Sequence, residues 1–176
     1  FSIHVFLQDT TDEQIASALI AAIETPDNQD AYRKDLLQYF DVDGSFQVLL
    51  MTCEGLDSMD TVERKKLSYR IQVYLEDITH NGSFFYYNSD FVLVANALSE
   101  EYLCRLVEGA IKRGKRRMPG LQLCVGIGSR CMDISQLSVS YQRAKAAAHI
   151  AMTQKKQVVK FDDCGLFRLL YMVKDK

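Results

Sequence analysis

The sequence predicts an α+β domain in which helices flank a mostly antiparallel sheet, and three observations favour this class. Hydrophobic residues make up 48% of the 176 residues, which is ample for one continuous core. Short apolar runs typical of strands alternate with longer segments that repeat apolar residues at helical spacing. Two strand-like runs, 83–87 and 91–95, are separated only by the turn-forming residues Asn88-Ser89-Asp90, which predicts a tight hairpin.

The first 44 residues read as a lead-in to the main domain. Apolar and polar residues alternate over 1–8, which predicts a half-buried strand. Two helices follow, one over 11–25 with Thr11 and Gln14 as a capping box, and one over 28–40 that presents one apolar face. We therefore expect an N-terminal strand and helix pair over 1–44 and the main domain over 45–176.

The order of elements after residue 44 constrains the fold. The expected elements are a buried strand at 45–53, a helix capped by Asp60, the hairpin, a helix capped by Ser99, a strand at 121–128, a helix capped by Ser135, a strand at 157–161 and a closing helix at 165–173. Strand, helix, hairpin, helix, strand is the split β-α-β order of a ferredoxin-like sheet. This order predicts helices packed on one face of a mostly antiparallel sheet.

Charge and composition exclude several classes of function. Lys and Arg total 21 against 23 for Asp and Glu, so the chain lacks the basic surplus that binding a phosphate backbone requires. No apolar run reaches eighteen residues, and the first residues lack the pattern of a secretory leader. We expect a soluble, cytoplasmic protein with no membrane partner.

The cysteines and histidines do not form a recognisable site. The five cysteines are irregularly spaced without a Cys-x-x-Cys pair, which argues against a disulfide framework or a zinc site and favours small buried side chains. His4, His80 and His149 fall on three separate predicted elements and share no metal-binding spacing. No nucleophile elbow is present. The sequence therefore predicts no catalytic, cofactor-binding or metal-binding residue, and no cofactor.

Two other features have a structural and a functional interpretation. Gly126 and Gly128 resemble part of a dinucleotide fingerprint but lack its third glycine and its helix, so we interpret them as a strand end where the backbone passes close to a neighbouring element. The basic run 112–117 could contact phosphate, RNA or an acidic partner. At a helix C-terminus the same cations complement the helix dipole, and we favour that interpretation.

The second half of the chain resembles the GGDEF fold, whose active members condense two GTP molecules into cyclic di-GMP. In that family a hairpin carries Arg-Tyr-Gly-Gly-Asp-Glu-Phe at its turn, and residues 86–91, Tyr-Tyr-Asn-Ser-Asp-Phe, occupy the same hairpin here. The segments 125–128 and 140–147 are similar to the strand and helix that follow in the family. The resemblance implies the fold of a GGDEF domain, preceded here by an N-terminal helical segment.

The departures from the family pattern argue against its chemistry. The resemblance implies that two glycines at the turn let GTP approach the backbone, whereas Asn88 and Ser89 stand there, and only Asp90 remains acidic. The strand that carries a metal-binding aspartate in the family reads Leu-Leu-Met-Thr-Cys over 49–53. Phosphoryl transfer depends on divalent ions, so we expect no cyclase activity.

A closer resemblance is to the degenerate GGDEF-like domain of bacterial transcription regulators of the PucR/CdaR type, over roughly residues 45 to 172. The residues that fit its strand and helix pattern are Gly126, Gly128, Leu137, Ser140, Tyr141, Ala144 and Ala147, and the segment 158–170 fits its ending. The resemblance implies a non-catalytic domain that senses a signal or mediates dimerisation. It also implies a homodimer, an unidentified small-molecule effector, and DNA contact only through a C-terminal helix-turn-helix domain. We expect the chain to be a fragment that ends before that domain.

Two alternatives remain open at this point. The chain could be a diverged nucleotide cyclase or phosphodiesterase that uses Asp90 together with Glu54 or Asp57 as metal ligands. It could also be an assembly domain that binds no ligand.

Overall fold

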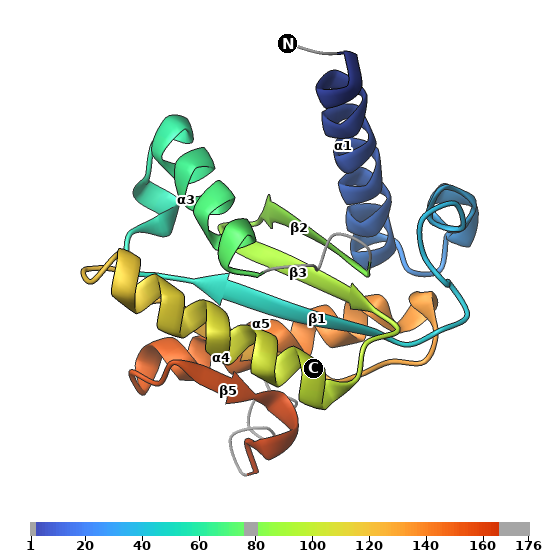
Figure 1. Ribbon diagram of the computed structural model, residues 1–176. Helices are drawn as coiled ribbons and strands as arrows, with labels where there is room; N and C mark the ends of the chain where they lie inside the picture. Colours follow the sequence, from blue (N-terminus) through green and yellow to red (C-terminus); the bar gives the residue numbers. More distant parts are fainter. Residues whose placement is uncertain (1–2, 76–80, 166–176) are drawn as a thin grey trace.

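A five-stranded sheet lies at the centre of the described residues (Figure 1). The computed structural model describes residues 3–75 and 81–165, and of residues 3–10 only the backbone. The strands are β1 (Phe46–Thr52), β2 (Gly82–Tyr87), β3 (Asp90–Asn96), β4 (Cys124–Ile127) and β5 (Val158–Lys160), in the order β2-β3-β1-β4-β5. Only β4 and β5 pair in parallel. The predicted α+β class with a mostly antiparallel sheet is therefore confirmed.

Helices cover both faces of the sheet, so the prediction of helices on one face is wrong. The helices are α1 (Ile3–Glu24), α2 (Arg33–Leu36), α3 (Thr61–Tyr74), α4 (Glu100–Arg117) and α5 (Leu137–Thr153). Figure 1 shows α3 and α4 in front of the sheet and α5 behind it. Within the described ranges, no helix combines the length and the apolar content needed to cross a bilayer.

Strand β1 is central because both of its faces are apolar. Val48 and Leu50 pack in one core cluster with α1 and α5, while Leu49 and Met51 pack in a second cluster with α3 and α4. Successive side chains of a strand point to opposite faces, so a continuous apolar run needs a layer of helices on each side. The apolar run at 45–53 predicted that this strand is buried on both faces. For the same reason, helices on a single face could not cover the sheet.

The predicted caps of α3 and α4 are confirmed. The Asp60 carboxylate accepts a hydrogen bond from the Glu63 backbone N–H at 2.8 Å, and the Ser99 hydroxyl accepts one from the Tyr102 backbone N–H at 3.2 Å. The predicted Ser135 cap of α5 is wrong, because a 3₁₀ turn over Ile134–Gln136 precedes that helix and the Ser135 hydroxyl donates to Asp133 instead.

The N-terminal strand is also a wrong prediction, since residues 3–8 belong to α1. The alternation over these residues is interrupted by Phe6, and neither glycine nor proline stops a helix before Pro26. The helix therefore runs through Thr11, which is not a cap. Residues 1–2 lie outside the described part of the chain.

The predicted helix over 28–40 is broken into a 3₁₀ turn, Gln29–Ala31, and the single turn α2. The break falls at Tyr32, which is fully buried and donates its hydroxyl to the Pro26 carbonyl at 2.5 Å. Burial of the Tyr32 ring in the core interrupts the helix at this residue. The closing helix predicted at 165–173 lies outside the described residues except for Gly165, and the domain boundary at residue 44 stays a prediction.

The backbone of β4 lies directly against the backbone of α5. A Cβ atom on Gly126 would lie 2.2 Å from the Ala148 nitrogen, and one on Gly128 would lie 2.2 Å from the Ser140 carbonyl oxygen. Both distances are far shorter than any van der Waals contact, so the two positions require glycine for packing. The interpretation of this glycine pair as a close approach of the backbone is confirmed.

We predict that Gly126→Ala lowers the free energy of unfolding by about 3 kcal/mol, because the added methyl group must push α5 off the sheet. Denaturant unfolding followed by circular dichroism measures this change. Gly114→Ala in α4 is the matched control, since an added Cβ there meets no atom within 4 Å. This control should raise stability by about 0.5–1 kcal/mol through helix propensity. Equal effects at the two positions would contradict the packing argument.

Candidate functional site

The candidate site lies at the tip of the β2–β3 hairpin, where the family resemblance places nucleotide chemistry. Its residues come from three parts of the fold: Thr52 ends β1, Asn88 lies in the hairpin turn with Asp90 just after it, and Tyr141 and Lys145 lie on α5. We call these five residues the hairpin-tip site. Strand pairing brings Tyr87 opposite Asp90, which fixes a two-residue turn at Asn88 and Ser89.

The turn confirms the predicted hairpin, but neither of its two central residues is glycine. Asn88 has a φ of 51° and Ser89 a φ of 72°, and positive φ at both central residues is what a type I′ turn requires. Glycine adopts such angles at no steric cost, whereas a serine side chain is strained there. The backbone thus keeps a glycine-like conformation while both residues project side chains from the tip.

Asp90 is held by partners from this chain. The Thr52 side chain hydrogen-bonds its carboxylate and the Lys145 ammonium lies near it, and both favour the charged form. Burial acts more strongly in the opposite direction, so the pKa of Asp90 is raised above its ordinary value. Asp57 adds to the rise through its own negative charge. Asp90 is therefore a carboxylate in a partly desolvated position.

A chain of polar contacts connects the hairpin to α1. The Tyr87 hydroxyl donates to the Glu24 carboxylate at 2.8 Å, in the last turn of α1. The Tyr87 ring packs against the Tyr141 ring with centroids 5.8 Å apart, and the Asn88 amide lies 3.4 Å from the Tyr141 hydroxyl. Burial, together with the bond to Glu24, raises the pKa of Tyr87 to about 12.

The sequence carries no pattern that predicts this chain of contacts. Glu24 and Tyr87 are 63 residues apart and carry no motif. In the sequence Tyr141 belongs only to a helix pattern, and its position at the tip depends on how α5 lies on the sheet. These contacts could be predicted only by first predicting that α1 and α5 lie on the same face of the sheet.

The other two proposed metal ligands, Asp57 and Glu54, do not form a metal site with Asp90. Asp57, in a 3₁₀ turn after β1, lies within electrostatic reach of Asp90, and Glu54 is exposed in the preceding turn. Within the described ranges, no three His, Cys, Asp or Glu side chains are grouped as a metal site would require. His149 is exposed on α5, whereas the side chains of His4 and His80 lie outside the described residues.

The cysteines are free thiols, and three of them confirm the predicted burial. Cys53, Cys124 and Cys131 are buried, while Cys104 and Cys164 are half-buried. Burial raises the pKa of the three buried thiols, which reaches about 11 at Cys131. A raised pKa leaves less of the reactive thiolate at neutral pH, as expected of packing residues.

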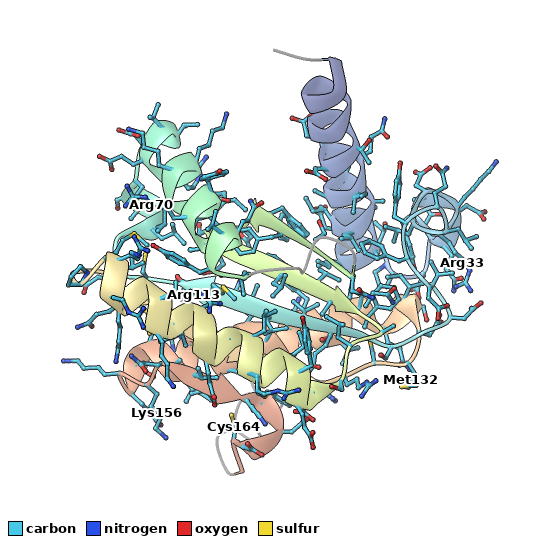
Figure 2. All side chains as sticks on the ribbon, viewed as in Figure 1. Arg33, Arg70, Arg113, Met132, Lys156 and Cys164 are labelled. Carbon is cyan, nitrogen blue, oxygen red and sulfur yellow. The ribbon has the colours of Figure 1, made fainter. Side chains whose placement is uncertain are left out.

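The basic run 112–117 lies in the last turns of α4, as predicted, and Figure 2 marks Arg113 there. The Arg113 guanidinium donates to the Tyr74 carbonyl oxygen at the end of α3, so this cation joins the two helices. Whether the remaining cations bind a partner stays a prediction.

The GGDEF-like domain family matches residues 17–150, which include α1 from Ser17 onwards, the hairpin and most of α5. This chain belongs to the GGDEF-like domain family. The match covers the hairpin-tip site completely and also the glycine pair on which α5 rests.

Two solved structures are similar to the chain at low sequence identity. The Vibrio cholerae LapD S helix-GGDEF-EAL structure, described as bound to c-di-GMP, is 10% identical with a TM-score of 0.51; the match covers 99% of this chain and 45% of that one. A microbial GGDEF domain, described in a novel interaction mode with cyclic di-GMP, is 16% identical with a TM-score of 0.48; the match covers 84% of this chain and 88% of that one. No curated protein matches the chain.

We predict that Asp90→Asn raises the free energy of unfolding at pH 7. A raised carboxyl pKa means that the folded state disfavours the charged form of Asp90. The charged carboxylate therefore lowers the stability of the folded state at pH values above its folded pKa, and this loss disappears below the pKa of the unfolded chain. The gain should therefore shrink to zero as the pH falls through the range in which aspartate titrates. Urea unfolding at several pH values measures it, and Glu54→Gln, at an exposed position, should change stability by less than about 0.5 kcal/mol. A loss of stability in Asp90→Asn at pH 7 would contradict this account.

We predict that Tyr87→Phe lowers the free energy of unfolding by about 1 kcal/mol, because it removes the hydrogen bond to Glu24. Glu24→Gln and the double variant complete a cycle, and the coupling between the two positions should account for most of that loss. The matched control is Tyr86→Phe, because the Tyr86 ring packs against the core cluster on the opposite face of the sheet. Additive effects of the two single substitutions would show that Tyr87 does not tie the hairpin to α1.

Proposed function

We propose that this GGDEF-like domain is a non-catalytic regulatory module of a bacterial transcription regulator of the PucR/CdaR type, where it senses a signal or mediates dimerisation. One observation carries the proposal. The hairpin tip, where the active family acts on nucleotides, is engaged in this chain by contacts with its own strand β1, helix α5 and helix α1.

The contacts of Asp90 support the absence of catalysis. Metal ions that neutralise phosphate charge need several oxygen ligands with free lone pairs. Here the Thr52 hydroxyl and the Lys145 ammonium already interact with the carboxylate, and a nearby cation disfavours the approach of a second one. Thr52 ends the strand that carries a metal-binding aspartate in the family, and a neutral hydroxyl is a poorer ligand for Mg²⁺ than a carboxylate.

The link from α1 to the hairpin supports a regulatory role. Helix α1 leads into the domain, and its last turn is joined to the tip through Glu24 and Tyr87. A rotation or shift of α1 must either move the hairpin or break this bond, so the two elements form one unit that can transmit a change. In the regulator, such a change would pass between an input region and the DNA-binding helix-turn-helix.

The partners of the proposed module follow from the same role. A regulator that reads paired half-sites favours a two-fold homodimer, and DNA would be contacted only by the helix-turn-helix domain. The LapD structure is described as bound to c-di-GMP. A small-molecule effector for this chain is consistent with that structural neighbour.

A diverged cyclase or phosphodiesterase is the second candidate, and it is favoured by the proximity of Asp57 to Asp90. Two carboxylates near one another can share a divalent ion, which would relieve their repulsion. On this candidate, turnover would depend on both residues.

The proposal predicts that the chain makes no cyclic di-GMP from GTP and Mg²⁺, and that it does not degrade cyclic di-GMP. Both reactions can be followed by chromatography, with a catalytically active GGDEF domain and an active phosphodiesterase as positive controls. Turnover that Asp90→Ala abolishes would overturn the proposal in favour of the second candidate. Turnover that Asp90→Ala leaves unchanged would come from a contaminating activity, so it would reject the second candidate and leave the proposal in place.

A further inference from the structure

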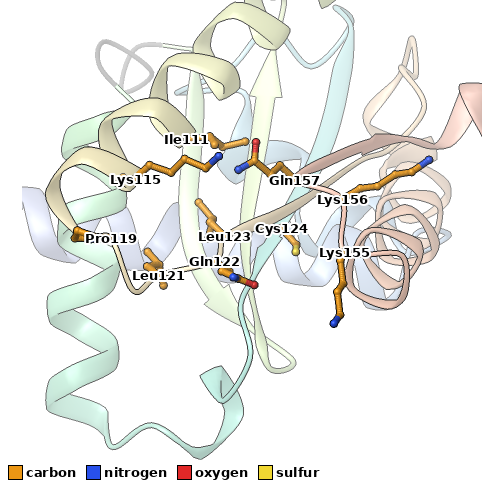
Figure 3. Close-up of a pocket in the computed structure, with 11 residues that line it drawn as sticks. Ile111, Lys115, Pro119, Leu121, Gln122, Leu123, Cys124, Lys155, Lys156 and Gln157 are labelled. Atoms are coloured by element: carbon orange, nitrogen blue, oxygen red, sulfur yellow. The ribbon is translucent and has the colours of Figure 1, made fainter.

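We propose that a pocket between the end of α4, the segment leading into β4 and the turn after α5 binds a small organic anion, a carboxylate or a phosphate on an apolar body. The pocket has a volume of about 520 Å³, within the range of small-molecule sites (Figure 3). It shares no residue with the hairpin-tip site, so the inference goes beyond the proposed function and does not depend on it.

The polar lining of the pocket carries only positive charge. Lys115 from α4 and Lys155 and Lys156 from the turn after α5 contribute three ammonium groups, and none of the described lining residues is acidic. Figure 3 shows Lys115 extending toward Gln157, while Lys155 and Lys156 extend outward from their turn. Their long, flexible stems allow the ammonium groups to fold back over a bound anion.

The helix dipoles do not cancel this charge. The C-termini of α4 and α5 both adjoin the pocket, and each helix end is equivalent to roughly half a negative charge. Two such ends offset about one of the three ammonium groups. The interpretation of basic residues as partners of the helix ends therefore leaves an excess of about two positive charges around the pocket.

The remaining lining suits the body of the ligand. Ile111, Leu121 and Leu123 supply an apolar wall, and the amide groups of Gln122 and Gln157 can donate hydrogen bonds to an oxygen atom. An apolar wall with a few convergent polar groups is the usual composition of a small-molecule site. A bare inorganic ion would leave the apolar wall in contact with water, so a ligand with an apolar body should bind more tightly.

The glycine at position 114 is a second, independent observation in favour of a binding pocket. Glycine inside a helix is destabilising, so its presence there usually has a packing or a functional reason. An added Cβ at Gly114 would meet no atom within 4 Å, so packing does not require glycine at this position. Gly114 lines the pocket, and any larger side chain there would project toward the space that a ligand needs.

Benzoate and phenyl phosphate are suitable probes for the full chain, with benzyl alcohol as the neutral analogue and inorganic phosphate as the bare anion. Titrations followed by ¹H–¹⁵N NMR should shift the amide signals of Leu123 and Gln157 with both aromatic anions. Comparing the two affinities identifies the preferred acid group. Benzyl alcohol and inorganic phosphate should bind at least about tenfold more weakly, because each lacks one half of the recognised chemistry.

Variants separate specific binding from general attraction of anions. Lys115→Gln should weaken the binding of the preferred probe about tenfold, since it removes a charged partner. Lys112→Gln on the same helix changes the net charge equally outside the pocket and should leave the affinity unchanged. Gly114→Leu should abolish binding while the chain remains folded by circular dichroism.

Three outcomes would overturn the proposal: no saturable shift up to about 10 mM of either aromatic anion, equal losses in Lys115→Gln and Lys112→Gln, or full affinity in Gly114→Leu. None of these outcomes bears on catalysis at the hairpin tip. Conversely, detection of cyclic di-GMP synthesis would reject the proposed function and leave the pocket in place.

Discussion

The contact between β4 and α5 determines how the rest of this domain is arranged. Gly126 and Gly128 have no side chains, so the helix lies on the backbone of the strand, and Val48 of the central strand donates its N–H to the Ser140 hydroxyl at 2.9 Å. This bond joins α5 to β1, in addition to the close contact of α5 with β4. A helix packed so closely against a strand has little freedom to slide or rotate, so the side chains of α5 have fixed positions relative to the sheet.

The hairpin tip depends on that placement. With α5 fixed, Tyr141 meets the hairpin ring of Tyr87 and Lys145 comes near Asp90, while Glu24 closes the arrangement from α1. In an active family member the equivalent region must stay open for a nucleotide. In this chain its polar groups interact with one another, which gives the domain a physical route from the N-terminal helix to the tip.

Local physics made much of this fold predictable. The Asp60 and Ser99 caps and the hairpin turn each depend on residues close in sequence, and the glycine pair is visible as a pattern at a strand end; each is confirmed. Two failures came where distant residues decide the outcome: burial of Tyr32 breaks a predicted helix, and the apolar faces of β1 demand helices on both sides. The candidate site was predictable in part. Its lost glycines and carboxylates are visible in the sequence, but its contacts with α1 and α5 require the assembled sheet.

The central claim is that the hairpin tip is engaged by the chain itself and does not accept a metal-bound nucleotide. The most direct measurement is a titration of Mg²⁺ and GTP into ¹⁵N-labelled protein, with the amide signals of Thr52, Asn88, Ser89 and Asp90 as reporters. The account predicts that these four signals stay in place at millimolar nucleotide. Saturable shifts at these residues, dependent on Mg²⁺ and lost in Asp90→Ala, would contradict it.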